Sequence, residues 1–170
     1  MNTELPRGLH PDDADLWHAA VDVLARSYRT GRHEVAAALR TADGRVSTGL
    51  HVEGSAGRSS VCAEGVALGN VFSGADAAVV AVVAALHRPG PGGGLLRPIA
   101  PCGVCRELLV DHCPGARVYT HDAGGSAVAV ELPGRPEDRR GFDPARATVP
   151  GSVTAWTALE LMPGKNPRGW

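Results

Sequence analysis

The residues of this chain best suited to chemistry are three cysteines and one glutamate: Cys62 and Glu64 in Cys-Ala-Glu, and Cys102 and Cys105 in Pro-Cys-Gly-Val-Cys. Each motif is expected at the start of a helix, where the N-terminus stabilises a thiolate. Cys102 and Cys105 share a helix face at this spacing, so they can bind one metal ion together with Cys62. Three protein ligands leave the fourth position of a zinc ion open to water, whose pKa the metal lowers. Glu64 can stand beside that water as a proton shuttle.

Two other interpretations of the cysteines are open at this stage. Cys113 could complete a structural four-cysteine zinc site, or the Cys-x-x-Cys pair could be redox active. Neither accounts for Glu64 two residues after Cys62, or for Pro101 directly before Cys102. The open zinc site is therefore the favoured prediction, and Cys113 is expected as an inert cysteine in the core or at a helix end.

The elements that must carry these residues follow from hydrophobic periodicity and turn signals. The pattern, including the hairpin signal Asp43-Gly44, predicts one sheet with helices on its faces in the order α-β-β-α-β-α-β-β, with a closing helix after them. The predicted helices span 12–28, 62–74, 102–112 and 154–162, and the predicted strands span 35–41, 46–52, 77–86, 117–121 and 126–132. Residues 88–97 are expected as a loop rich in glycine and proline.

Length and composition fit a single α/β domain over residues 1–170, in which 133–150 is polar and punctuated by prolines. The 17 Lys and Arg residues balance 18 Asp and Glu residues, which argues against a nucleic-acid polymer or an anionic membrane as the main partner. The longest apolar run, 77–86, is too short to cross a membrane, and the first residues lack a secretory signal. We therefore expect a cytoplasmic protein that acts on a small molecule.

Matching residues extend beyond the two cysteine motifs. Tyr28, the segments 35–39, 43–45, 48–49 and 52–53, the run Pro101-Cys-Gly-Val-Cys-Arg-Glu107 and the tail Glu160-Leu-Met-Pro163 resemble the cytidine deaminase family. This resemblance implies a cytidine deaminase-like three-layer α-β-α fold with one mixed five-stranded sheet, in which 133–153 form a loop insertion relative to the minimal family members. Its three-cysteine type implies a Zn²⁺ cofactor and a homotetramer, as in the small cytidine deaminases and blasticidin-S deaminases.

By this resemblance the reaction is hydrolytic deamination of a free cytosine nucleoside or a cytosine-nucleoside antibiotic. Water attacks C4 of the base, ammonia leaves, and Glu64 carries protons to N3 and to the departing ammonia. The alternative is a non-catalytic zinc-stabilised binding or assembly module of the same fold, and Glu64 discriminates the two because such a module needs no proton shuttle. The sequence leaves open which nucleoside is deaminated, and whether in salvage, secondary metabolism or resistance.

Several positions depart from the family pattern and bear on the substrate. His51 and Glu53 stand where ribonucleoside deaminases carry Asn-x-Glu for the sugar hydroxyls, and His33 stands where an aromatic residue packs on the base. Ala63 and Ala100 complete the expected substrate pocket. A pocket holding a histidine beside a carboxylate is expected to accept a modified sugar, or one bearing a carboxylate, better than plain ribose.

Two further residues are expected to act from outside the pocket. Gly65 follows Glu64 where relatives usually have arginine, so Arg106 is expected to supply positive potential behind the thiolates. Trp170, in the tail, is expected near the active site of an adjoining subunit, because the family carries an aromatic residue there.

Overall fold

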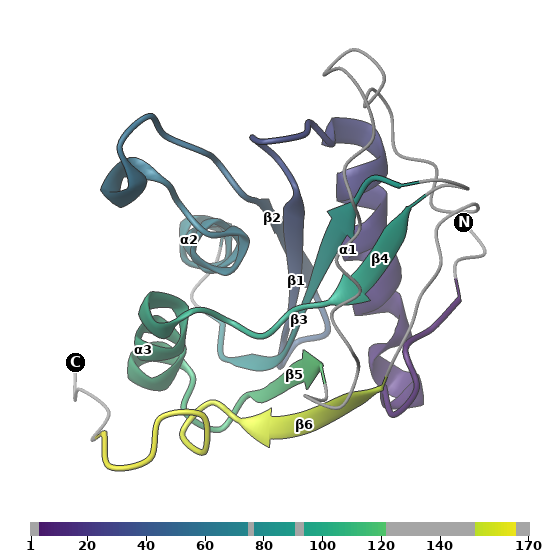
Figure 1. Ribbon diagram of the computed structural model, residues 1–170. Coiled ribbons are helices and arrows are strands. Elements are labelled where there is room, and N and C mark those ends of the chain that lie inside the picture. Colours follow the sequence, from purple (N-terminus) through teal and green to yellow (C-terminus); the bar gives the residue numbers. More distant parts are fainter. Residues whose placement is uncertain (1–3, 75–76, 91–93, 122–151, 166–170) are drawn as a thin grey trace.

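A mixed sheet forms the centre of the molecule (Figure 1). The computed structural model describes residues 4–74, 77–90, 94–121 and 152–165. Its strands are β1 (Val35–Thr41), β2 (Val46–Leu50), β3 (Val79–Arg88), β4 (Leu95–Pro98), β5 (Arg117–His121) and β6 (Val153–Thr157). They lie in the order β2-β1-β3-β5-β6, with β4 paired to β3. Strands β3 and β5 are parallel, and the other pairs are antiparallel.

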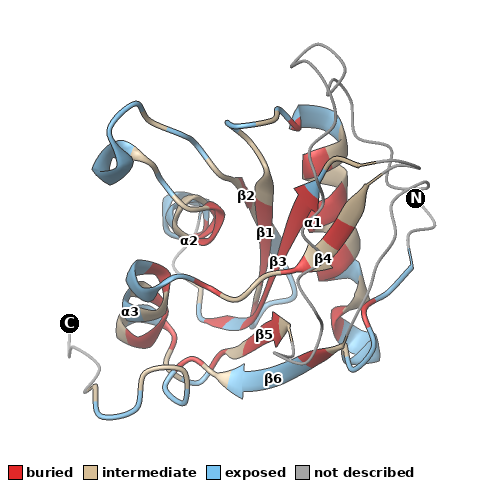
Figure 2. Ribbon diagram, in the orientation of Figure 1, coloured by how far each residue is buried: buried red, intermediate tan, exposed pale blue. Residues whose placement is uncertain are grey.

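Helices cover both faces of this sheet. Helix α1 (Ala14–Ser27), preceded by the 3₁₀ turn η1 (Pro11–Asp13), lies on one face, whereas α2 (Ala63–Gly74) and α3 (Gly103–His112) lie on the other (Figure 1). Within β1, Ala36 and Ala38 pack on the α1 side, and Ala37 and Leu39 pack on the opposite side. Buried residues are concentrated on the strands and the inner sides of the helices (Figure 2). The predicted three-layer α-β-α fold is confirmed.

The first hairpin forms where the sequence predicts it. Strands β1 and β2 pair in antiparallel register across residues 42–45, and Gly44 adopts a φ of +86°. Thr41 Oγ1 donates a hydrogen bond of 2.5 Å to Asp43 Oδ1, and the Arg45 N–H is 3.4 Å from the same oxygen. The turn therefore needs glycine at its left-handed position and an aspartate that closes it.

Two predictions about the later part of the chain are wrong. Within 88–97, which is predicted as a loop, β3 continues to Arg88 and β4 begins at Leu95. The two strands pair in antiparallel register, so their backbone groups hydrogen-bond to each other. The predicted closing helix at 154–162 begins instead as strand β6, whose β-branched residues pair with β5. The sheet therefore has six strands among the described residues rather than five. The predicted strand 126–132 and residues 133–151 of the insertion lie outside the described residues.

One close contact fixes where α2 lies on the sheet. A Cβ added at Gly49 would lie 2.3 Å from the Ala63 carbonyl oxygen and 2.4 Å from the Ala67 nitrogen. Ser47 of the same strand donates a hydrogen bond of 3.1 Å to the Ala67 carbonyl. Because only glycine leaves room for this approach, Gly49 sets the position of the first turn of α2, which follows Cys62.

The segment after β6 lies against α3. Arg106 Nη1 donates to the Leu161 carbonyl at 3.4 Å, and Lys165 Nζ lies 3.1 Å from Glu107 Oε1 and 3.0 Å from Asp111 Oδ1. Lys165 is the only lysine of the chain. Among the described helices, none is both long and apolar enough to span a membrane.

Candidate active site

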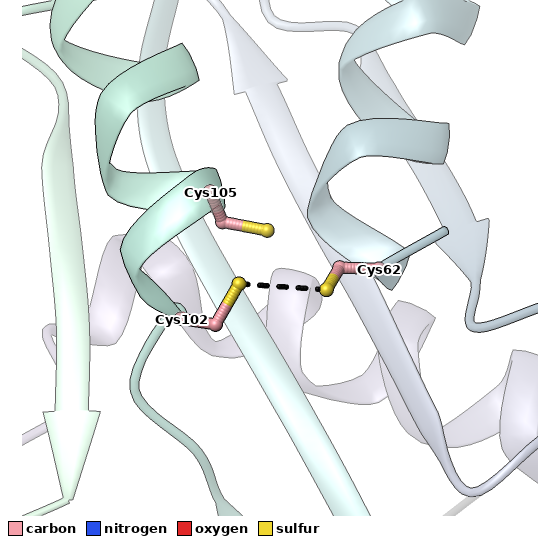
Figure 3. Close-up of side chains that lie close together, drawn as sticks. All are labelled: Cys62, Cys102 and Cys105. Atoms are coloured by element: carbon pink, nitrogen blue, oxygen red, sulfur yellow. Dashed lines mark hydrogen bonds between the residues drawn. The ribbon is translucent and has the colours of Figure 1, made fainter. Parts of the chain in front are cut away.

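The three cysteines predicted to bind a metal ion lie together at the N-termini of α2 and α3 (Figure 3). Cys62 directly precedes α2, Cys102 is the N-cap of α3, and Cys105 lies in the first turn of α3. Their Sγ atoms all lie within 4.8 Å of one another, and those of Cys62 and Cys102 are 3.5 Å apart. All three are free thiols, so the group could hold a metal ion.

Backbone hydrogen bonds hold both helix starts in place. The carbonyls of Cys62 and Cys102 accept the N–H of the residue four positions later, at 3.1 and 2.9 Å. Before α2, Val61 and Val52 exchange two backbone hydrogen bonds of 2.9 and 3.0 Å. This short bridge ties the approach to Cys62 to the segment that follows β2, which also carries His51.

The charges of the site call for a cation. Burial raises the pKa of Cys62 to about 11, and burial together with the Glu64 carboxylate raises the pKa of Cys105 further. For Cys102, burial opposes ionisation, but hydrogen bonds led by the Cys105 backbone N–H outweigh it and lower the pKa. Cys62 and Cys102 line a cavity that contains neither lysine nor arginine among its described lining residues. A soft divalent ion is what allows three thiolates here, so the donor set fits Zn²⁺.

Glu64 is a buried carboxyl that faces the same cavity. Glu64 lies in the first turn of α2 and is 5% exposed. The Cys105 thiol donates a hydrogen bond of 3.5 Å to its Oε2. Burial raises the pKa of Glu64, so this group takes up a proton more readily than an ordinary glutamate. Glu64, Cys62 and Cys102 line one cavity of about 140 Å³, which brings a proton carrier beside the sulfurs.

The rest of the cavity wall is mostly apolar. His51, Ala63 and Ala100, all predicted as pocket residues, line it. Val35 and Ile99 line it as well, and the sequence analysis missed them. Ile99 could have been found, because it directly precedes Ala100 in the segment that leads to the second cysteine motif. Val35 carries no such signal, since it is one of many small apolar residues in β1.

The other two predicted substrate residues, His33 and Glu53, do not line the cavity. Each of them contacts His51 instead. The ring of His33 donates from Nδ1 to the His51 carbonyl at 2.7 Å, and Glu53 Oε2 lies 3.0 Å from His51 Nε2. Of these three residues, His51 is the one that lines the cavity. Trp170, predicted to act across a subunit boundary, lies outside the described residues.

Arg106 lies one turn into α3, behind the second cysteine motif. Its Nε donates to the Pro101 carbonyl at 3.0 Å, and its Nη1 reaches the Leu161 carbonyl. Pro101 directly precedes Cys102, so this arginine ties the turn that presents Cys102 to the segment after β6.

Comparison with known proteins decides the family. The profile described as "Cytidine and deoxycytidylate deaminase zinc-binding region" matches residues 11–121. The chain belongs to this deaminase family. Its relatives include a blasticidin-S deaminase of Bacillus cereus, 34% identical over 103 residues, which are 60% of this chain and 74% of the relative. A cytidine deaminase of Halalkalibacterium halodurans is 34% identical over 110 residues, which are 61% and 76% of the two chains.

Solved structures agree with the fold of this deaminase. The cytidine deaminase of Bacillus anthracis superposes with a TM-score of 0.62 at 16% identity, covering 89% of this chain and 86% of that one. The cytidine deaminase of Burkholderia pseudomallei gives 0.59 at 24% identity, covering 88% and 95%. The deaminase is thus a zinc-dependent hydrolase with a cytidine deaminase-like fold, as the sequence predicts.

Proposed function

We propose that this deaminase removes the exocyclic amine of a free cytosine nucleoside or a cytosine-nucleoside antibiotic. The observation that carries the proposal is the buried Glu64 carboxyl, which shares one cavity with Cys62 and Cys102. A module that used zinc only for stability would have no use for a buried carboxyl at this place, because burying it is costly. The similarity to both cytidine and blasticidin-S deaminases supports the cytosine group as the common substrate element.

In this proposal Cys62, Cys102 and Cys105 hold the zinc ion, and the ion supplies the Lewis acidity that lowers the pKa of water. Glu64 takes a proton from the attacking water and delivers protons to N3 of the base and to the leaving amine. A C4–O bond forms and the C4–N bond breaks, so cytosine and water become uracil and ammonia. The raised pKa of Glu64 suits a group that must both accept and return protons.

Arg106 and the two helix N-termini are the sources of positive potential that we propose behind the thiolates. Each helix start adds a partial positive charge near a sulfur, and Arg106 lies on the first turn of α3. Arg106→Gln is expected to weaken zinc binding several-fold, measured by competition with a metal chelator. A zinc affinity equal to that of the wild type would contradict this role.

The sugar preference follows from His51. With Glu53 Oε2 3.0 Å from its Nε2, this histidine offers the cavity a larger group with a different set of hydrogen-bond donors and acceptors than an asparagine would. We propose that cytidine is a poor substrate and that a cytosine nucleoside with an altered sugar, including one with a carboxylate, is better.

Ammonia release together with metal content tests the whole proposal. The panel is cytidine, deoxycytidine, cytosine, blasticidin S and adenine and guanine nucleosides, with one zinc ion per chain confirmed in the sample. We expect release from at least one cytosine nucleoside and none from the purines. One zinc ion per chain without release from any cytosine compound would instead indicate a zinc-stabilised binding module.

We also propose a cytoplasmic homotetramer in which Trp170 reaches the site of a neighbouring copy. Exposed apolar side chains beside the cysteines support a covering subunit, since Val104 is 69% and Val61 45% exposed. Removal of residues 168–170 is expected to lower activity while zinc stays bound. A fully active monomer in light scattering would contradict this assembly.

A further inference from the structure

His51 is held from several directions before any substrate arrives. Its backbone N–H donates to the Val35 carbonyl at 2.8 Å, and its carbonyl accepts from the His33 ring at 2.7 Å. Its Nε2 lies 3.0 Å from Glu53 Oε2. Its other ring nitrogen, Nδ1, is buried and has no hydrogen-bond partner among the described residues. The side chain is therefore fixed at one nitrogen and unsatisfied at the other.

Glu53 is in turn held by the loop that leads to Cys62. Ser60 Oγ donates to Glu53 Oε1 at 3.0 Å and accepts the Gly54 N–H at 3.0 Å. A Cβ at Gly54 would lie 2.0 Å from Ser59 Oγ and 3.0 Å from the Ser59 carbonyl carbon, so a side chain at position 54 would crowd this loop. Each carboxylate oxygen of Glu53 therefore lies against a protein group, Ser60 Oγ at one oxygen and His51 Nε2 at the other, and Glu53 is not among the residues that line the cavity.

We propose that Glu53 and Ser60 are positioning residues that act on the substrate only through His51. The Glu53 carboxylate, 3.0 Å from Nε2, favours the proton on that nitrogen and holds the ring in place. Ser60 in turn holds the Glu53 carboxylate through its hydrogen bond to Oε1. Metal-bound histidines are oriented in the same way, by a hydrogen-bond partner of the ring that does not itself touch the metal. This inference rests on the proposed function, since it concerns how that same pocket reads the sugar.

A double-mutant cycle separates this role from direct contact with the sugar. With cytidine as the probe, Glu53→Ala is expected to lower kcat/KM about tenfold and Ser60→Ala about threefold, mainly through KM. In the His51→Ala background the same two changes are expected to have less than about a twofold effect, because the group they position is gone. Ser60→Thr, which keeps the hydroxyl, is expected to restore most of the loss.

Ser59→Ala is the matched control in the same loop. Its hydroxyl donates to the Ala56 carbonyl at 2.7 Å rather than to Glu53, so its kcat/KM is expected to stay within about twofold of the wild type. An undiminished effect of Glu53→Ala in the His51→Ala background would overturn the proposal, because Glu53 would then contact the substrate itself.

The tautomer of His51 gives a test that needs no turnover. The test is ¹⁵N NMR of the zinc-loaded protein. The ring-nitrogen signals of His51 are assigned as those missing from the spectrum of His51→Asn. The neutral His51 ring is expected to carry its proton on Nε2. Glu53→Ala is expected to remove that preference, and Ser59→Ala to keep it. A wild-type proton on Nδ1 would overturn the proposal. Absence of deamination by the wild type would count against the proposed function alone, because this tautomer test would still stand.

Discussion

Two buried carboxyl groups, one on each face of the sheet, show how differently the two faces are built. Asp13, on the α1 face, is fully buried and accepts hydrogen bonds of 2.8 Å from both Arg117 Nε and Tyr119 Oη, with Arg40 Nε 3.6 Å away. Glu64, on the opposite face, has the Cys105 thiol 3.5 Å away, and no lysine or arginine among the described residues forms an ion pair with it. The first carboxylate is neutralised within the protein, whereas the second is left free to exchange a proton.

The two faces of the sheet also differ in the size of the side chains that pack on them. The α1 face contains the large buried side chains Leu16, Trp17 and Leu24, while the first turns of α2 meet the sheet with Ala63 and Ala67 and only its later part adds Leu68 and Val71. Small residues let the helix start approach the sheet closely, at the cost of buried apolar area. We therefore expect the α1 face to supply most of the stability and the other face to supply the chemistry.

The largest effect is expected from Glu64→Gln, which removes the proton carrier and keeps the shape. Ammonia release is expected to fall by about 10²–10⁴-fold, because an amide cannot shuttle a proton. Zinc content and the free energy of unfolding are expected to stay close to those of the wild type. Near-normal ammonia release would remove Glu64 from the catalytic role and with it the contrast between the two carboxyls.

Asp13→Ala tests the other carboxyl and is expected to act on stability. Removing the buried carboxylate of this network is expected to lower the free energy of unfolding by about 2–3 kcal/mol, because Arg117 and Tyr119 lose their partner while the Arg117 side chain stays 43% exposed to water. Urea denaturation measures this loss, and kcat of the folded fraction is expected to be unchanged.

Asp15→Ala is the matched control for Asp13. Asp15 pairs with the same Arg40, but its side chain is 58% exposed, so the loss is expected to stay below about 1 kcal/mol. Equal losses from the two aspartates would mean that burial of the network does not carry the stability of the α1 face.

His51→Asn is expected to change which substrate the pocket prefers. The ratio of kcat/KM for cytidine to that for blasticidin S is expected to rise about tenfold, since an amide can both donate to and accept from ribose hydroxyls. His10→Asn, a change at an exposed histidine on the α1 side, is the control and is expected to leave the ratio unchanged. If His51→Asn also left the ratio unchanged, His51 would lie outside the sugar subsite.

Cys113→Ser is expected to have the smallest effect on the site. Cys113 is 5% exposed at the end of α3, and burial raises its pKa to about 12. Zinc content is expected to stay at one ion per chain, with a stability loss of about 1–3 kcal/mol from the buried hydroxyl. Loss of the metal would reveal a four-cysteine structural site instead of the open one.

Local signals with a strong physical cause were sufficient to predict much of the fold and the centre of the site. Asp43-Gly44 identifies the first hairpin because few sequences accept its turn geometry, and the two cysteine motifs identify the helix starts that carry them. Strand β4 was missed because Leu95–Pro98 is short and surrounded by glycine and proline, and its identity comes from pairing with β3. Strand β6 likewise exists because it pairs with β5, a tertiary contact that periodicity does not contain.

The residues around the edge of the site also depend on tertiary contacts that local sequence patterns do not contain. The two-residue spacing of His51 and Glu53 predicts that both side chains face the pocket, as they would along a strand. Strand β2 instead ends at Leu50, and Glu53 turns to pair with His51 and Ser60. The position of Glu53 therefore depends on a loop contact seven residues away, which no local pattern could reveal.

The lone lysine gives chemical labelling a single side-chain amine target. Although burial alone would lower the pKa of Lys165, hydrogen bonds to Asp111 and Glu107 outweigh it and raise that pKa. An amine-reactive ester needs the neutral amine, so it acylates Lys165 more slowly while the tail lies on α3 than once the tail has left it. Acylation also removes the charge that both carboxylates bind. The rate of that one modification therefore reports, without any engineered probe, how often the C-terminal segment leaves the helix that carries two of the three cysteines.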